Sequence, residues 1–369
     1  MPNQTSIAFL NPIASREKYF YRMQLSQAFR QLLLLAPLLT ASATMAKATT
    51  KTIRAMGADD KASDSLNLRV ITFNIRYAAS ASTYEKPWSV RGPLVIDTVS
   101  ALAENATSAG AIPIIGMQEV LHEQVVDIAS GLGEAEWKYI GTGRDDGKEK
   151  GEYCPIWYKP SQLSLVSSTQ KWLSPTPDEP SYWPGAGSRR YVIVGVFEVK
   201  NGSEEGKGKG KGKRKGEGKG KRFIAANTHL DNASSEARSE GVKIVLKVIR
   251  DVQQEYGPGL PVTLSGDFNS QPGEDAYKEM VSDGYLKELY NLADKEERFG
   301  PYETYTGFVP DEVPDVSQRI DFVWIGPEKA DSNSTAKWDV KRYEVVDNVV
   351  SGVFMSDHRP VLGDISLQL

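Results

Sequence analysis

Short apolar runs alternate with helix-like patterns from residue 66 to the C-terminus. Residues 68–73 carry apolar side chains on both faces, which is typical of a strand inside a layered α/β protein. Apolar residues at helical spacing predict helices over 94–104, around 125–132 and over 234–256. Further strands are predicted at 112–117, 154–158, 164–173, 191–199, 222–230, 261–267, 320–325 and 359–367.

This number of strands is too large for one doubly wound parallel sheet, and several neighbouring strands suit antiparallel hairpins. The economical arrangement is an α/β fold, a four-layer sandwich of two packed mixed β-sheets flanked by helices. A chain of 369 residues is long enough for one large domain with tails. We therefore expect a single domain over residues 66–369.

The N-terminal segment has the layout of a secretory signal. A short apolar run at 32–41 follows Arg22 and Arg30 and precedes small residues, and it is too short to span a bilayer. We predict a leader over 1–46 with its true start at Met23, a linker over 47–65 and a secreted protein; the alternative is a buried helix fused to a disordered leader. Export would make potential glycan acceptors of the Asn-x-Ser/Thr triplets at Asn105, Asn201, Asn232 and Asn333.

A Gly/Lys alternation lies between the strands predicted at 191–199 and 222–230. It cannot bury a core, so we predict a disordered insert over 201–222 at a hairpin tip; the alternative is a basic arm that contacts phosphate or acidic polysaccharide. Residues 204–222 hold nine Lys or Arg and three Glu, a local charge of +6, so the formal −4 of the chain leaves −10 elsewhere. Such an acidic body fits a cleft of carboxylates that holds a cation, and it disfavours broad capture of duplex DNA.

Cysteine and histidine are scarce, which limits the choice of metal. Cys154 is the single cysteine, so no intramolecular disulfide can form, and we expect it to be a small buried residue in a strand. Zinc would need several Cys or His ligands, whereas the chain has three His in total. Hard oxygen ligands such as Glu119 and Asp357, with amides nearby, suit Mg²⁺ or Mn²⁺.

Polar side chains gather where the apolar runs end. A rigid sheet can direct several groups into one crevice at its strand ends. Each group alone is ambiguous between a catalytic site and an ordinary turn; Gly-Asp-Phe-Asn, for example, also occurs where a strand ends in a turn. Six such groups in one order are a far more specific sign of a catalytic site. In chain order these groups are Asn74, Gln118-Glu119, Asn227-Thr228-His229, Asp267-Phe268-Asn269, Asp321 and Ser356-Asp357-His358.

In that order the groups resemble the motifs of the endonuclease/exonuclease/phosphatase superfamily of metal-dependent phosphoesterases, nearest to its deadenylase-like hydrolases. The resemblance runs from residue 66 to the C-terminus and leaves out the leader and the Gly/Lys insert. The matching segments are Thr72-Phe73-Asn74-Ile75-Arg76, Gln118-Glu119-Val120, Asn227-Thr228-His229-Leu230, Ser265-Gly266-Asp267-Phe268-Asn269-Ser270, Arg319-Ile320-Asp321-Phe322-Val323 and Ser356-Asp357-His358-Arg359-Pro360-Val361.

The resemblance implies a role for each of these residues. Glu119 would be the principal metal ligand, supported by Asn74, with Asp357 completing the metal environment. Asp267 would orient or deprotonate the attacking water, and Asn269 would hold the water or the phosphate. His358, braced by Asp321, would contact the phosphate or act as the base, and His229 would contact a phosphate oxygen. Whether Asp267 or His358 takes the proton stays open.

Two further residues are candidates for the substrate wall. Arg144 lies in a glycine-rich loop and can clamp phosphate with two N–H groups, although a solvated turn explains it equally well. Tyr153 could donate a hydroxyl. His122 lies at a predicted helix start and is interpreted as structural.

The branch of the superfamily sets the expected chemistry. The inositol-phosphate phosphatases are disfavoured because their Trp-Cys-Asp-Arg type motif is replaced here by Arg319-Ile320-Asp321. An exported protein does not meet cytoplasmic messenger tails, so we expect hydrolysis of phosphodiester bonds in nucleic acid, phosphorylated glycan or lipid headgroups by an activated water. The alternatives are a phosphomonoesterase on sugar or lipid phosphates and a non-catalytic binding module. We also expect a monomer without stable membrane insertion.

Overall fold

The computed structural model describes residues 65–79, 83–200, 221–309, 316–327 and 337–368. The predicted leader, the linker up to residue 64 and the Gly/Lys insert up to residue 220 lie outside the described residues. Ser65, the last residue assigned to the linker, is already the first residue of a strand, and Arg222, the last assigned to the insert, also begins one.

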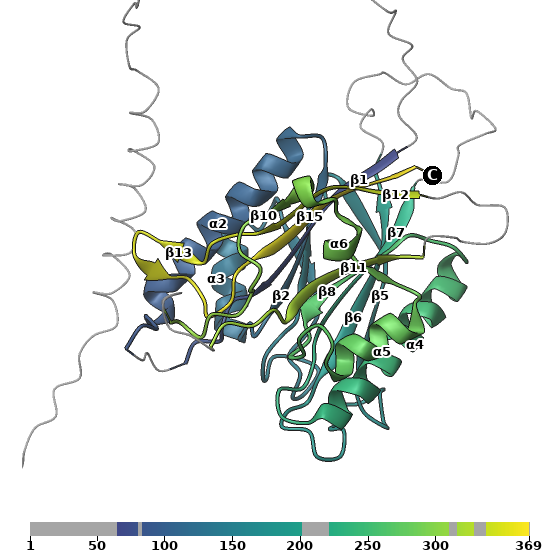
Figure 1. Ribbon diagram of the computed structural model, residues 1–369, viewed down its shortest axis with the longest axis horizontal. Coiled ribbons are helices and arrows are strands. Elements are labelled where there is room, and N and C mark those ends of the chain that lie inside the picture. The colour runs from purple at the N-terminus through teal and green to yellow at the C-terminus, as the bar shows by residue number, and fades with distance from the viewer. Residues whose placement is uncertain (1–64, 80–82, 201–220, 310–315, 328–336, 369) are drawn as a thin grey trace, which may run out of the picture. The chain divides into compact units, whose positions relative to one another are not determined.

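Two mixed sheets form the centre of the fold (Figure 1). In the seven-stranded sheet, β1 pairs in parallel with β2 and antiparallel with β15. Its strands in spatial order are β10 (Arg298–Phe299), β12 (Lys337–Val345), β15 (Val361–Gln368), β1 (Ser65–Asn74), β2 (Ile112–Gln118), β4 (Ile156–Tyr158) and β3 (Lys138–Ile140).

The six-stranded sheet is antiparallel except where β7 runs parallel to β8. Its strands in spatial order are β5 (Leu163–Trp172), β6 (Tyr191–Val199), β7 (Arg222–His229), β8 (Val262–Asp267), β11 (Asp321–Gly326) and β9 (Lys287–Glu288). A separate hairpin joins β13 (Val349–Val350) to β14 (Val353–Phe354).

Helices cover the outer face of each sheet. Alternation along β1 directs Leu68 and Val70 into the core between the sheets, and Ile71 and Phe73 towards the helices. The seven-stranded sheet packs against α2 (Trp88–Ser108) and α3 (His122–Leu132), and the six-stranded sheet against α4 (Ser235–Tyr256) and α5 (Asp275–Asp283). The shorter helices are α6 (Leu289–Leu292) and η1 (Lys295–Glu297). The four-layer sandwich predicted from the sequence is therefore confirmed.

The two sheets are in close contact near the ends of β2 and β7. A Cβ atom at Gly116 would lie 2.4 Å from Ser265 Oγ and 2.8 Å from Asn227 Oδ1, so only glycine fits there. Asn227 crosses between the sheets, and its Nδ2 donates to the carbonyls of Met117 (2.8 Å) and Pro155 (3.0 Å). This contact fixes one sheet against the other directly below the polar strand ends.

Each predicted strand and helix is present. The sequence pattern does not predict β12, α5 or the short elements β3, β9, β10, β13, β14, α6 and η1. In β12 the two-residue alternation of apolar side chains changes phase at a β-bulge between Val340 and Arg342. In α5 only Ala276 and Met280 are buried, which is too few to give a helical pattern. Cys154 is buried, as expected, but it lies two residues before β4 and not within the strand predicted over 154–158; burial raises the pKa of its thiol. No helix within the described ranges is long and apolar enough to cross a membrane.

Candidate active site

Strand register brings three predicted site residues into one row across the six-stranded sheet. His229 lies opposite Asp267 in the parallel pair β7 and β8, and Asp267 lies opposite Asp321 in the antiparallel pair β8 and β11. The last residues of β7 and β8 thus meet the first residue of β11. All three residues are buried, so their charges interact with little screening by water.

His358 reaches this row from the loop before β15, in the other sheet. Its Nδ1 lies 2.8 Å from Asp321 Oδ2, and its Nε2 lies 3.7 Å from Asp267 Oδ2. Burial by itself lowers the pKa of an imidazole, but Asp321 and then Asp267 outweigh it and raise the pKa of His358 to about 10. His358 is therefore a buried cation at neutral pH whose Nε2–H faces Asp267.

Asp267 lies at the centre of the row and accepts hydrogen bonds from two sides. Its Oδ1 accepts the backbone N–H of Asn269 at 2.9 Å, and its Oδ2 accepts Asn74 Nδ2 at 3.0 Å. Burial, with Asp321 close by, raises the pKa of Asp267 to about 7. A carboxylate whose pKa lies near neutral pH is well matched to taking a proton from water.

Asn269 holds His229 against this carboxylate. Its Nδ2 donates to the carbonyl of Leu230 at 3.1 Å and lies 3.0 Å from His229 Nε2, which in turn lies 3.4 Å from Asp267 Oδ2. Burial, followed by the charges of Arg190 and Arg144, holds the pKa of His229 well below its usual value. His229 is therefore neutral, and its Nε2 accepts the Asn269 amide.

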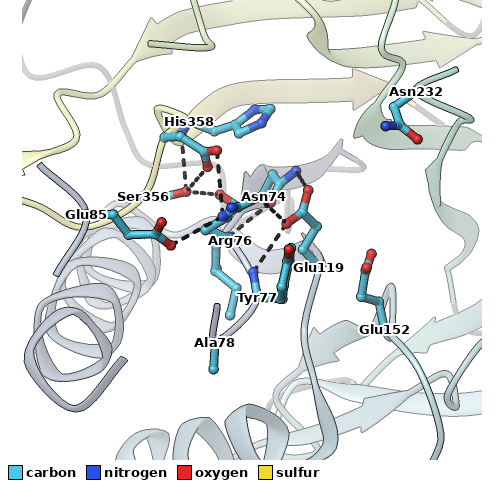
Figure 2. A network of polar contacts seen from close by, with 12 residues as sticks. Asn74, Arg76, Tyr77, Ala78, Glu85, Glu119, Glu152, Asn232, Ser356 and His358 are labelled. Carbon is cyan, nitrogen blue, oxygen red and sulfur yellow. Dashed lines mark hydrogen bonds and ion pairs between the residues drawn. The ribbon is translucent and has the colours of Figure 1, made fainter. Parts of the chain in front are cut away.

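The second half of the site lies at the end of β1 and β2. Asn74, the last residue of β1, donates from Nδ2 to Glu119 Oε1 at 3.1 Å as well as to Asp267, so a single amide joins the two halves. The backbone N–H of Tyr77 donates to Glu119 Oε2 at 3.2 Å. Figure 2 shows Glu119 held between these two donors.

Asp357 faces Glu119 across the side chain of Arg76. The Arg76 guanidinium lies 3.9 Å from Glu119 Oε2 and 4.0 Å from Asp357 Oδ2. Ser356 anchors the segment, because its Oγ donates to the carbonyl of Asn74 at 2.7 Å (Figure 2). Burial raises the pKa of Asp357; His358 opposes this effect and the neighbouring Glu119 adds to it.

The carboxylate oxygens of Glu119 and Asp357 are suitable ligands for a hard divalent cation. They have an amide beside them, and burial, with Glu119 close by, raises the pKa of Asp357, so a bound cation would stabilise the ionised form of this carboxylate. Ligand atoms of Asp267, Asp321 and His358 also lie within 4.8 Å of one another, but Asp321 and His358 are already paired. Asn74 presents its donor nitrogen to the carboxylates, so its role as a metal ligand, like the choice between Mg²⁺ and Mn²⁺, stays a prediction.

The two predicted substrate-wall residues have different surroundings. Arg144 Nη1 donates to Glu152 Oε2 at 2.7 Å, and the same oxygen lies 3.9 Å from His229 Nδ1, so Arg144 adjoins the site through Glu152. Tyr153 is buried in the core, where its hydroxyl donates to the carbonyl of Lys148 and lies 3.0 Å from His122 Nδ1. The Tyr153 hydroxyl already has these two partners, and its donation of a hydrogen bond to the substrate stays a prediction. His122 begins α3, as predicted.

Sequence reasoning assigned no role to several residues at the site. Arg76 lies within the quoted Asn74-Ile75-Arg76 segment, and Glu85 Oε1 lies 3.3 Å from its Nε. Glu152 and Arg190 belong to no polar strand end, so the pattern that identified the others does not reach them. The adjacency of Arg76 to Asn74 was the one usable signal.

Comparisons with known proteins place this geometry in a family. No family model matches the chain, and no curated protein matches it. Among solved structures, an endonuclease/exonuclease/phosphatase from Bacteroides vulgatus is 30% identical with a TM-score of 0.64, covering 81% of this chain and 98% of that one. The mannosyl-6-phosphatase Bt3783 of Bacteroides thetaiotaomicron is 28% identical with a TM-score of 0.65, covering 81% and 99%.

A third solved structure shows how far the resemblance to deadenylase-like hydrolases extends. The catalytic domain of human Nocturnin, a deadenylase, is 19% identical with a TM-score of 0.56, covering 82% of this chain and 94% of that one, and at this identity it shows the fold alone. The more similar bacterial structures, together with strand-end residues that meet in one place, lead to a single assignment. The chain belongs to the endonuclease/exonuclease/phosphatase family of phosphoester hydrolases.

Proposed function

We propose that the chain hydrolyses a phosphoester by in-line attack of a water that Asp267 deprotonates, with Mg²⁺ or Mn²⁺ held by Glu119 and Asp357. One observation carries the proposal: a buried carboxylate with a pKa of about 7 lies at the meeting point of the two sheets' strand ends. The residues within hydrogen-bond or ion-pair distance of it are Asn74, Asn269, His229 and His358.

The surrounding residues divide the work of the reaction. His358 is kept protonated by Asp321 and donates a hydrogen bond to a phosphate oxygen, so it is unsuited to act as the base. His229 and Asn269 orient the water and the phosphate beside Asp267. The divalent ion, when bound, offsets the negative charge that develops on the phosphate oxygens.

Removal of the base and removal of the metal test this mechanism. Asp267→Asn keeps the shape of the side chain, and we expect kcat to fall by about 10²- to 10⁴-fold, the usual contribution of a general base. Asp251→Asn is the matched control, because Asp251 is an exposed partner of Lys247 on α4. Excess EDTA should abolish turnover, and added Mg²⁺ or Mn²⁺ should restore it. Full activity in Asp267→Asn or in EDTA contradicts the mechanism.

For the substrate, we propose a sugar phosphate. The sequence favours a phosphodiester and leaves the phosphomonoester of a sugar or lipid as the alternative. Similarity along nearly the whole length of a mannosyl-6-phosphatase supports the sugar monoester. Parallel assays on mannose 6-phosphate and bis(p-nitrophenyl) phosphate separate the two, and hydrolysis of the diester alone would exclude our choice.

We also propose that the protein is exported. The support is the apolar run at 32–41 with arginines before it and small residues after it. Expression of the full chain in a secreting host, followed by N-terminal sequencing of the protein in the medium, tests this proposal. Retention inside the cell with residues 23–46 still attached would contradict it.

A further inference from the structure

A second polar cluster lies beside His229, on the side of the ring away from Asp267. His229 Nε2 faces Asp267 at 3.4 Å, whereas Nδ1 faces Glu152 Oε2 at 3.9 Å. Arg144 Nη1 donates to the same Glu152 oxygen at 2.7 Å, and Arg190 Nη1 lies 4.0 Å from it. The His229 ring separates this cluster from Asp267, so the leaving group of a phosphate ester held at Asp267 would reach the cluster by extending past the ring.

Arg190 is buried with part of its hydrogen-bonding capacity unused. It is only 7% exposed, and its Nη2 donates to Asn232 Oδ1 at 3.2 Å. Within the described part of the chain, its Nε and Nη1 have no hydrogen-bond partner. The nearest carboxylate oxygens, on Asp231 and Glu152, lie at 3.9 Å and 4.0 Å, too far for a hydrogen bond. Buried N–H groups of this kind call for an acceptor.

The charge of the cluster is balanced. The two guanidinium groups of Arg144 and Arg190 are matched by the carboxylates of Glu152 and Asp231. Asp231 is itself held by the backbone N–H groups of residues 187, 188, 233 and 234. A second phosphate would bring two negative charges into this balanced set, so the cluster does not suit an anion.

Donors and acceptors alternate around the cluster. Arg190 offers two unused N–H groups, and Glu152 offers carboxylate oxygens close by. Figure 2 shows the polar ends of Glu152 and Asn232 pointing towards each other from two different loops. A hydroxyl group donates one hydrogen bond and accepts others, so it can bridge an arginine and a carboxylate at the same time.

We propose that Arg190, Glu152 and Asn232 bind hydroxyl groups of the substrate's leaving group, and that the site thereby selects phosphate esters of polyhydroxylated alcohols such as hexoses. This inference rests on the proposed function, because it takes the reacting phosphate to lie at Asp267. Arg190 is the specificity-determining residue, and Asn232 holds its guanidinium in place.

A comparison of two monoesters tests the inference on the full chain, purified from a host that does not attach N-glycans. Mannose 6-phosphate has a leaving group rich in hydroxyls, whereas that of p-nitrophenyl phosphate has none. We expect Arg190→Gln to raise KM for mannose 6-phosphate by roughly 10-fold or more, the usual effect of losing a hydrogen bond from a charged donor. Its kcat/KM for p-nitrophenyl phosphate should fall much less than that for mannose 6-phosphate, because burial, the main cause of the low pKa of His229, remains when the Arg190 charge is removed. Glu152→Gln should act in the same direction.

Arg222→Gln is the matched control, because Arg222 loses the same charge at the opposite end of β7, where it pairs with Glu198. A binding measurement gives a readout without turnover. In an Asp267→Asn background, calorimetry should show that Arg190→Gln weakens binding of mannose 6-phosphate and leaves binding of inorganic phosphate unchanged.

Three results would overturn the inference. Equal losses on both esters, with weaker binding of inorganic phosphate, would mean that Arg190 acts on the phosphate or on the fold. Unchanged kinetics in both variants would mean that the cluster does not touch the substrate. If the wild-type protein hydrolyses p-nitrophenyl phosphate but not mannose 6-phosphate, the hexose is excluded and the proposed metal-dependent phosphoesterase activity stands. If the wild-type protein hydrolyses neither ester, the proposed function itself is refuted.

Discussion

Asn227 should contribute more to the free energy of unfolding than a buried polar side chain that hydrogen-bonds only within its own sheet, because its hydrogen bonds join the two sheets. It is fully buried in β7, and its Nδ2 donates to the carbonyls of Met117 and Pro155 on the side of the other sheet. Its Oδ1 accepts Gln118 Nε2 at 2.7 Å. The perturbation that removes all of these contacts is Asn227→Ala.

The size of the loss follows from the contacts. Four hydrogen bonds of the amide disappear, of which the one from Ser265 Oγ can be replaced by its contact with the carbonyl of Ala226 at 3.3 Å. The other three are worth about 1 kcal/mol net each, and the carbonyl of Met117 loses its side-chain donor in a region that water does not reach. The deleted amide also leaves a small cavity, since Gly116 and Ser265 pack directly against it. We expect the free energy of unfolding to fall by about 3–4 kcal/mol in total.

Urea denaturation followed by tryptophan fluorescence measures this change as a shift in the midpoint at constant slope. Thr228→Val is the matched control: Thr228 lies next in β7 and makes one hydrogen bond within its own sheet, to the carbonyl of Tyr191 at 2.9 Å. This control should cost about 1 kcal/mol. If Asn227→Ala costs no more than Thr228→Val, the contacts between the sheets do not stabilise the fold as argued.

Three further outcomes follow from the charges. Asp321→Asn removes the main group that raises the pKa of His358 to about 10, so we expect the alkaline limb of the plot of kcat against pH to move to lower pH. An unchanged alkaline limb would contradict the proposed role of the Asp321–His358 pair. The pKa of Asp267 is raised from 3.8 to about 7, so the folded state binds this proton more tightly than the unfolded state. The stability of the wild type therefore falls as the pH rises from 3.8 to 7. In EDTA, the Tm of Asp267→Asn should lie above that of the wild type at pH 8 but not at pH 4. Burial raises the pKa of Asp275, but the hydrogen bonds from Arg238 outweigh burial and lower this pKa to about 2. The stability that ionised Asp275 contributes is therefore fully present above pH 3.8 and is lost as the pH falls towards 2. In urea titrations, Arg238→Gln should have a free energy of unfolding about 1 kcal/mol below that of the wild type at pH 7, and the difference should vanish at pH 2.

The central row of the site could be predicted because the sheet restricts where the ends of neighbouring strands lie. Asp267 and His229 each close an apolar run, and Asp321 opens one. Parallel neighbours end on the same edge of a sheet, and an antiparallel neighbour begins there, so the register places all three side chains together whatever the loops do. The strands of the two sheets and most of the helices could be predicted because their apolar residues recur at the spacing typical of each kind of element.

Residues outside the strand ends could not be placed in this way. The direction of Tyr153 depends on the loop after residue 141, and nothing in the sequence shows that its hydroxyl faces Lys148. Arg190 precedes β6, and its partner Asn232 follows β7, so their contact depends on how two loops fold over one sheet edge. Local pattern carries no information about contacts of this kind.

Backbone conformation explains why the two halves of the site meet so closely. Arg76, Glu119 and Asn269 all have positive φ, at 58°, 58° and 47°, and each follows closely on the end of a strand. Left-handed backbone is costly for residues other than glycine, by about 1–3 kcal/mol each, so the rest of the fold must impose it. At each position the chain turns sharply out of its strand and leaves the side chain beside the sheet edge, where Glu119 and Asn269 lie next to Asn74 and Asp267. The stability supplied by contacts between the sheets, Asn227 above all, is therefore what permits a strained set of polar residues to stay assembled around one carboxylate.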